Sequence, residues 1–262
     1  MGKLKDSLQH AANPRILVLD IETAPMLVEV WRLSKNDYIS TSQMRRPARV
    51  LSFAYQWAGQ KRIGFHSEWA DGSDQMIQAA WDLLNEADIL VAFNSPFDVK
   101  HLQAQFILRG MQPPAPWKDI DLLRVVRREF GHGLAANRLD YVCRVLGIGS
   151  KVSHEGHGLW TRVLDGDEKA RKLMEKYNKG DVDITTKLYF HLRDRGWIKS
   201  HPHVGLWTGV DKCCPACGSE NLVREGLIRT PVTSYAGVRC ADCGTLSRLN
   251  HMKQRTETRP AR

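Results

Sequence analysis

Three short groups of acidic and polar residues are spaced along this chain of 262 residues. The groups are Asp20 with Glu22, Asn94 with Asp98, and Tyr177 with Asp181. Carboxylate oxygens are the ligands that hard divalent cations such as Mg²⁺ and Mn²⁺ prefer. Four carboxylates gathered in one place are costly unless a cation compensates them. If the fold brings the three groups together, they predict a divalent-metal site.

The first group lies at the end of an aliphatic run, residues 15–21, which predicts a buried strand. Side chains two residues apart on a strand share a face, so Asp20 and Glu22 are expected to point the same way. Thr23 begins a segment that ends the strand, which places the pair at its carboxyl end, where open α/β sheets bind ligands. An isolated pair of this kind would also suit an exposed acidic strand end.

Asp98 has two interpretations. Ser95 and Pro96 are typical of an N-cap and a first helical residue, and Asp98 then completes a pattern like a capping box. The same geometry places its carboxylate in a first helical turn, where the helix dipole stabilises an anion. Asn94, at the end of the preceding strand, could hydrogen-bond a substrate or shape the loop.

Tyr177 and Asp181 are four residues apart on a predicted helix and therefore share a face. Asp183 points elsewhere, so Asp181 is the acid expected beside Tyr177. The alternative is an ordinary surface helix, whose exposed face would suit Lys176 and Lys179.

In this order, the segments 19–23 (LDIET), 93–98 (FNSPFD) and 177–182 (YNKGDV) resemble the three exonuclease motifs of the DEDD superfamily. These are ribonuclease-H-like 3′–5′ exonucleases, which include polymerase proofreading domains, and the tyrosine is typical of one subclass. The resemblance covers roughly residues 14–195. It departs from the pattern where Ser95 and Pro96 follow Asn94, since many members have glycine or histidine there, and this affects the substrate loop.

The resemblance implies two Mg²⁺ or Mn²⁺ ions that support in-line attack of water on a phosphodiester bond. Its implied metal ligands are Asp20, Glu22, Asp98 and Asp181. Tyr177 would orient the attacking water, since a phenol is a poor base at neutral pH. Asn94 is assigned to substrate binding, and mononucleotides would be released from a 3′ end.

Other polar residues compete for these roles. Asp121, which forms a second acidic pair with Asp119, is expected to cap or begin a helix. The segment 154–157 (HEGH) has one residue too few between its histidines for a zinc-protease helix, so we expect a loop near the substrate or plain surface. Three basic residues could contact phosphates, although solvated surface is favoured: Arg138, Arg144 and Lys151.

Two Cys-x-x-Cys-Gly segments with a spacer of 22 residues between them predict a tetrahedral zinc site. Its four ligands are expected to be Cys214, Cys217, Cys240 and Cys243. Cys213 is interpreted as a bystander because Cys214 gives the matching spacing. The module resembles a zinc ribbon, and its zinc is either purely structural or supports nucleic-acid binding. Redox chemistry is less favoured, because no thioredoxin-like pattern surrounds either pair.

The bulk composition narrows the function classes. Lys and Arg exceed Asp and Glu by 38 − 29 = 9, which favours a polyanionic partner, although a basic surface can also serve solubility alone. There is no apolar run long enough for a membrane span, and residues 1–13 lack the apolar centre of a signal peptide. We therefore expect an intracellular, cytoplasmic protein, in which nucleoid association is possible.

Strand and helix patterns alternate along the first long segment and predict an α/β fold: a ribonuclease-H-like mixed sheet flanked by helices, plus a small zinc ribbon. Strands are expected at 15–21, 50–57, 61–66 and 89–93. Helices are expected at 73 onward, 95–109, 121–130, 138–146 and 168–193, with a loop over 147–160. The predicted domains are 14–199 for the exonuclease and 211–249 for the ribbon, followed by a disordered basic tail at 250–262.

The sequence thus predicts a metal-dependent 3′–5′ exonuclease that acts on nucleic acid. The favoured substrate is single-stranded DNA, with replication or repair proteins as further partners. An RNA exonuclease and a structure-specific endonuclease would use the same metal site. A nucleic-acid-binding adaptor that keeps the fold as a scaffold is a third class.

Overall fold

The computed structural model describes residues 13–32 and 38–258, and the chain divides into two compact units. The first comprises residues 15–124 and 132–186. The second comprises residues 125–131 and the chain from Lys187 onward, with residues 13–14. This division differs from the domain boundary predicted at residue 199, because the last turns of the long helix α7 (Glu168–Arg193) group with the C-terminal unit.

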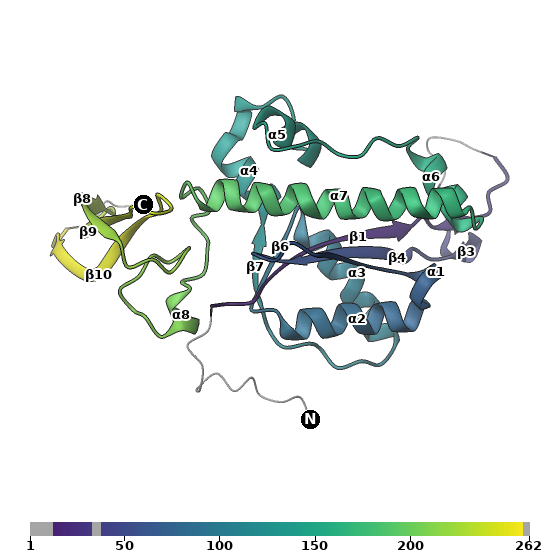
Figure 1. Ribbon diagram of the computed structural model, residues 1–262, viewed down its shortest axis with the longest axis horizontal. Helices are drawn as coiled ribbons and strands as arrows, with labels where there is room; N and C mark the ends of the chain where they lie inside the picture. The colour runs from purple at the N-terminus through teal and green to yellow at the C-terminus, as the bar shows by residue number, and fades with distance from the viewer. Residues whose placement is uncertain (1–12, 33–37, 259–262) are drawn as a thin grey trace. The chain divides into compact units, whose positions relative to one another are not determined.

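A five-stranded mixed sheet forms the centre of the first unit (Figure 1). Its order is β5-β4-β1-β6-β7, with antiparallel pairing from β5 to β1 and parallel pairing from β1 to β7. The strands are β1 (Ile16–Ala24), β4 (Arg49–Trp57), β5 (Ile63–Ser67), β6 (Ile89–Ala92) and β7 (Lys118–Asp121). The predicted fold class, a ribonuclease-H-like mixed sheet with flanking helices, is confirmed.

Helices cover both faces of this sheet, as Figure 1 shows for α7 on one face and α2 with α3 on the other. The helices of this unit are α1 (Glu68–Asp71), α2 (Ser73–Glu86), α3 (Ser95–Leu108), α5 (Leu139–Val145), α6 (His157–Leu164) and most of α7. The division between the units falls within α4 (Leu122–Phe130) and within a 3-10 turn (Gly131–Gly133). Leu17, Leu19 and Ile21 of β1 lie in the core beneath α2 and α3. The alternate residues of β1, which include Asp20 and Glu22, therefore face α7.

Strand β1 extends further than its parallel neighbour β6. Its ladder with β6 pairs Ile16 to Val18 with residues 89–91, whereas its ladder with β4 continues to Ala24. The acidic half of β1 is thus bonded to a strand on one side only. A register shift between Glu22 and Thr23 bends the strand at its end.

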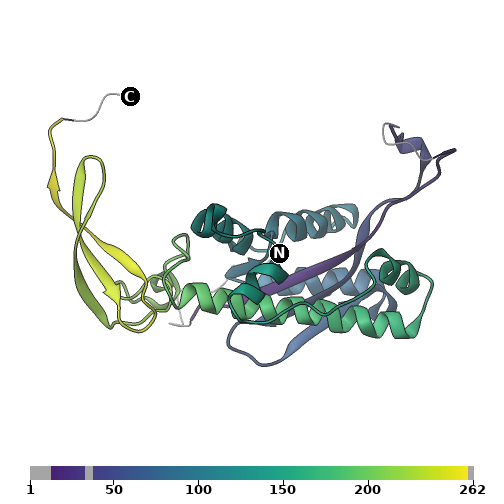
Figure 2. The ribbon, with the colours of Figure 1, turned by 90° about the horizontal axis from the view of Figure 1, so that it is seen from above.

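Beyond β1 the chain forms a two-stranded arm. Strand β2 (Leu27–Val28) pairs antiparallel with β3 (Met44–Arg46), and a 3-10 turn (Thr41–Gln43) precedes β3. Figure 2 shows these strands projecting past the end of the five-stranded sheet.

Local structure differs from the sequence predictions at three places. Asn94, not Ser95, is the N-cap of α3, with φ of 73°. Helix α6 begins at His157, inside the segment expected to be a loop. Strand β7 was not predicted, and its last residue, Asp121, was assigned to the following helix, because only Ile120 in its short sequence supplies a fully apolar signal.

The second unit contains a three-stranded antiparallel sheet of order β10-β9-β8 and the short helix α8 (Gly205–Thr208). Its strands are β8 (Leu222–Arg229), β9 (Thr233–Cys240) and β10 (Leu246–Arg255). The prediction of a disordered tail from residue 250 is wrong for residues 250–255, because β10 pairs with β9 as far as Arg255. Residues 259–262 of that tail lie outside the described residues. No described helix is both long and apolar enough to cross a membrane.

Candidate active site

Three of the four predicted carboxylates meet at the end of β1. One oxygen each of Asp20, Glu22 and Asp181 lies within 4.8 Å of the others. β1 supplies the first two on one face, and α7 crosses that face and supplies the third. Residues more than 150 positions apart in sequence are thereby brought into one cluster, here called the acid group.

Asp98 lies beside the acid group but outside the set of mutually close oxygens. Its Oδ1 accepts a hydrogen bond of 3.0 Å from the backbone N–H of Ile21. That N–H lies beyond the point where pairing with β6 stops, so the carboxylate takes the place of a missing strand partner. The side chain is only 3% exposed, which makes this bond structurally important. In the structure, Asp98 Oδ1 therefore serves β1, not the capping box that its spacing also allowed.

Asn178 orients the acid group from α7. Its side-chain amide donates to Oδ2 of Asp20 at 2.6 Å and to the Asp20 carbonyl at 3.1 Å. Its own oxygen accepts from the hydroxyl of Ser52 at 3.3 Å. The residue is fully buried, and sequence reasoning assigned it no role. Its place three residues before Asp181 on the same helix face was the available signal.

Lys151 also belongs to the site, contrary to the solvated-surface interpretation. Its ammonium donates to Oδ2 of Asp181 and, at 3.1 Å, to the hydroxyl of Tyr177. The loop that carries it is anchored by its backbone N–H, which donates to Asp140 at 3.0 Å. Lys151 was missed because no periodicity in its Gly- and His-rich segment relates it to a helix 30 residues later.

Burial and mutual repulsion dominate the electrostatics of the acid group. Burial, then the charge of Asp181, raises the pKa of Asp20 to about 7. Burial and the neighbouring carboxylates likewise raise the pKa values of Glu22 and Asp98 well above their ordinary range. Burial acts to lower the pKa of Lys151, but the charges and hydrogen bonds of Asp181 and Tyr177 together outweigh it and raise that pKa, so the ammonium stays charged.

Aromatic side chains surround Tyr177, the tyrosine of the third motif. The ring of Tyr177 meets His154 edge-on at 4.6 Å between centroids and Trp160 at 6.1 Å. Burial raises the pKa of Tyr177 above its usual value, so the phenol stays protonated. A hollow of ≈ 380 Å³ opens beside Trp160, at the C-terminal end of β1, the strand that carries Glu22. Its lining comprises Thr23, Pro25, Gly156, His157 and Trp160.

Asn94 lies outside the acid group. It adopts a left-handed backbone conformation between β6 and α3, and its N–H donates to Asp121 Oδ1 at 3.0 Å. The same oxygen accepts from the N–H of Leu123 at the start of α4, which matches the capping role expected for Asp121. Asn94 therefore shapes the loop, and its binding to substrate stays a prediction. Asp119 accepts from the hydroxyl of Ser95 at 2.7 Å.

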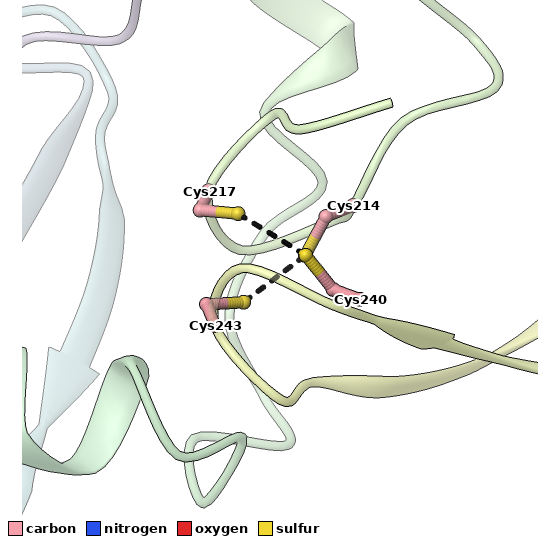
Figure 3. Close-up of side chains that lie close together, drawn as sticks. All are labelled: Cys214, Cys217, Cys240 and Cys243. Atoms are coloured by element: carbon pink, nitrogen blue, oxygen red, sulfur yellow. Dashed lines mark hydrogen bonds between the residues drawn. The ribbon is translucent and has the colours of Figure 1, made fainter. Parts of the chain in front are cut away.

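In the second unit, the four predicted cysteines converge, as Figure 3 shows. Sγ of Cys214 lies 3.4 Å from that of Cys243, and Sγ of Cys217 lies 3.7 Å from that of Cys240. Four sulfurs placed tetrahedrally at about 2.3 Å from a zinc ion would be about 3.8 Å apart, so the set fits Zn²⁺. Cys213 is excluded, because its thiol points to the carbonyl of Val210 at 3.1 Å.

The acid group fits a hard divalent cation. It offers oxygen ligands only, and their clustered negative charge is compensated by one ammonium, that of Lys151. Oδ1 of Asp181 is buried and has no hydrogen-bond partner among the described residues. A buried carboxylate oxygen in that state is costly unless a ligand such as a metal satisfies it.

The comparison with protein families agrees with the fold. A family model described as the RNase H superfamily matches residues 40–193. Two solved structures of Trypanosoma brucei RNase D, the second of them in complex with RNA U12, are similar at 16% and 18% identity, with TM-scores of 0.42 and 0.43. Each covers 67% of this chain, which spans 56% and 54% of them, little more than half their length. No curated protein matched the chain.

Proposed function

Because this chain belongs to the RNase H superfamily, we propose that its acid group makes it a metal-dependent nuclease, specifically a 3′–5′ exonuclease of the DEDD type. One observation carries the proposal: one oxygen each of three carboxylates from β1 and α7 lies within 4.8 Å of the others, and one of these acids, Asp181, has a buried oxygen with no hydrogen-bond partner among the described residues. A surface helix or an acidic strand end would not require such a cluster. The order of the three motifs supports the finer assignment to the tyrosine-bearing subclass.

Two Mg²⁺ or Mn²⁺ ions, when bound, would supply Lewis-acid activation of water and stabilisation of the leaving 3′ oxygen. Asp20, Glu22 and Asp181 would hold one ion. Asp98, which lies beside the acid group, would contribute a carboxylate to the second. Because Oδ1 of Asp98 is committed to Ile21, Oδ2 is the oxygen available to a ligand. Asn178 fixes the orientation of Asp20 as a ligand.

Tyr177 would position the attacking water. Its protonated phenol cannot act as a base at neutral pH, and its oxygen already accepts from Lys151 at 3.1 Å. The phenolic proton is then available for donation to Asp181 or to a water. Lys151 therefore acts as a positioning residue, because it ties the phenol to the metal-ligand carboxylate.

The substrate that we propose is single-stranded DNA. The net charge of +9 and the open hollow beside Trp160 support a flexible polyanion whose end reaches the acid group. The four-cysteine cluster would bind a structural Zn²⁺. Exposed arginines on its sheet, Arg224, Arg229 and Arg248, would add phosphate contacts or a surface for replication or repair proteins.

The test is a 5′-labelled single strand incubated with the full chain and Mg²⁺ or Mn²⁺. We expect a ladder that shortens from the 3′ end, with Asp181→Ala as the inactive control. Cleavage of a circular strand would replace the exonuclease with an endonuclease, and preference for an RNA strand would change the substrate. Binding without cleavage in either metal would favour the adaptor and overturn the proposal.

A further inference from the structure

The arm formed by β2 and β3 carries an unusual share of exposed apolar surface. Trp31 is fully exposed, at 103% of its reference area, and Tyr38 is 88% exposed. Smaller apolar side chains on the same arm are also exposed: Met26, Leu27, Val30 and Ile39. Soluble monomeric proteins rarely expose apolar surface of this extent, and such surface usually marks a binding site.

The arm has an ordered base. The pairing of Leu27 with Arg46 is extended by the N–H of Glu29, which donates to the carbonyl of Gln43 at 2.9 Å. The side chain of Gln43 donates back to the carbonyl of Glu29 at 3.0 Å and accepts from the N–H of Ser40. Trp31 and Tyr38 lie beyond these bonds and line one hollow of the arm together.

Charge distinguishes between the partners that could cover this surface. Residues 25–32 and 38–46 carry three arginines, Arg32, Arg45 and Arg46, and one acid, Glu29. Glu29 is already paired with Arg45 at 2.7 Å, so the arm keeps a net positive charge. Flat aromatic side chains interleaved with arginines are typical of surfaces that bind single-stranded nucleic acid through base stacking and phosphate contacts. An apolar protein partner would not require the arginines.

The arm also continues the strand that carries the acid group. Trp31 follows Glu22 by nine residues, so at about 3.3 Å per residue it lies within roughly 30 Å of it. A strand bound on the arm would therefore be held close to the place where the proposed reaction occurs.

We propose that this arm is a second binding site for single-stranded nucleic acid, in which Trp31 and Tyr38 stack on bases upstream of the end at the acid group. The proposal rests on the proposed function for its direction only. The binding itself depends on the arm and is measurable without cleavage.

The experiment measures the affinity of the full, zinc-loaded chain carrying Asp20→Asn, without Mg²⁺, for fluorescent DNA strands of about 4 and about 16 nucleotides. Trp31→Ala and Tyr38→Ala are each expected to weaken binding of the longer strand by about 10-fold or more, whereas Trp31→Phe keeps a ring and most of the affinity. Leu108→Ala is the matched control, since this exposed residue lies on α3, away from the arm. Unchanged melting temperatures show that the variants fold.

Unchanged affinity in both alanine variants would overturn the proposal and leave the arm to a protein partner. An equal loss for a blunt duplex would also overturn it, because paired bases offer no free faces for stacking. If the wild-type chain binds as expected but cleaves no strand, the proposed exonuclease fails while the binding site stands.

Discussion

The side-chain amide of Asn178 donates a hydrogen bond of 2.6 Å to Oδ2 of Asp20, and so joins helix α7 to strand β1 at the acid group. A second bond, to the Asp20 carbonyl, fixes the amide against the backbone of the strand. An acid proposed as a metal ligand is therefore oriented by a buried neutral residue. Residues of this kind act on a metal through its ligands.

Replacement of Asn178 by alanine is expected to lower the cleavage rate by about 10- to 100-fold at fixed Mg²⁺, because Asp20 loses its orientation. Higher Mg²⁺ should recover part of the loss. Ser52→Ala is the control, since it removes only the 3.3 Å bond to the far side of the amide and should have a smaller effect. The measurement is the initial rate against Mg²⁺ concentration, and identical curves for Asn178→Ala and wild type would contradict the assignment.

Two substitutions of Asp98 separate its structural role from its role as a ligand. Asp98→Ala leaves the buried N–H of Ile21 without an acceptor and is expected to destabilise the protein by about 1–3 kcal/mol. Asp98→Asn keeps an oxygen for that bond, so its stability should be close to wild type. Both should reduce cleavage by about 100-fold or more, because neither offers a carboxylate to a metal.

Urea unfolding followed beside the cleavage assay distinguishes the two Asp98 variants. If Asp98→Asn unfolds as readily as Asp98→Ala, the hydrogen bond to Ile21 is not what stabilises β1.

The acid group predicts an unusual dependence of stability on pH. Asp20 ionises near 3.8 when unfolded but near 7 in the folded, metal-free chain, so the folded state binds more protons between these values. The contribution of Asp20 to stability is therefore lost as pH rises from about 4 to about 7. Mg²⁺ binds the ionised form, so its stabilising effect should be larger at pH 8 than at pH 6.

Melting temperatures without and with Mg²⁺ across this range test the linkage. The difference in melting temperature between wild type and Asp20→Asn isolates the contribution of the Asp20 carboxylate. If that difference does not change with pH, the predicted linkage between the ionisation of Asp20 and stability is wrong.

Lys151→Ala is expected to destabilise the metal-free protein by about 1–3 kcal/mol, because Asp181 then loses its cation among other acids. Cleavage should also fall, by about 10- to 100-fold, since Tyr177 loses the donor that holds its hydroxyl. Lys151→Arg should recover most of the stability. Arg144→Ala, an exposed pair with Asp140, serves as the control and should stay within about 0.5 kcal/mol of wild type. An effect of Arg144→Ala as large as that of Lys151→Ala would show that only general surface charge is at work.

Cys217→Ser should release zinc and unfold the three-stranded sheet, because thiolates supply much of the stability of so small a module. Cys213→Ser is the matched control, and the adjacent cysteine should leave one zinc per chain. Metal content and cleavage of short strands are the two readouts. Retained zinc in Cys217→Ser would contradict the ligand set, and loss of all cleavage would show that the two units depend on each other.

The sequence predicted the features that local patterns control. The aliphatic runs of β1 and β6, the periodicity of α7 and the repeated cysteine spacing each depend on neighbouring residues, and each appears in the structure. Lys151 was assigned to the surface because its contact with Asp181 depends on the path of an irregular loop. The second half of β10, from residue 250, was interpreted as a disordered basic tail because its composition is polar, whereas backbone pairing with β9 orders it regardless of side chains.

The length of β6 has a consequence for how the site could be lost. β6 ends at Ala92, whereas β1 continues to Ala24, and Asp98 fills the position that a longer β6 would occupy. Two additional residues in β6 would give Ile21 a backbone carbonyl as its acceptor and displace the Asp98 carboxylate from its place beside the acid group. An insertion of this kind would remove the fourth proposed ligand while every acidic residue remained in the sequence, so the unequal length of two neighbouring strands matters to the site as its ligands do.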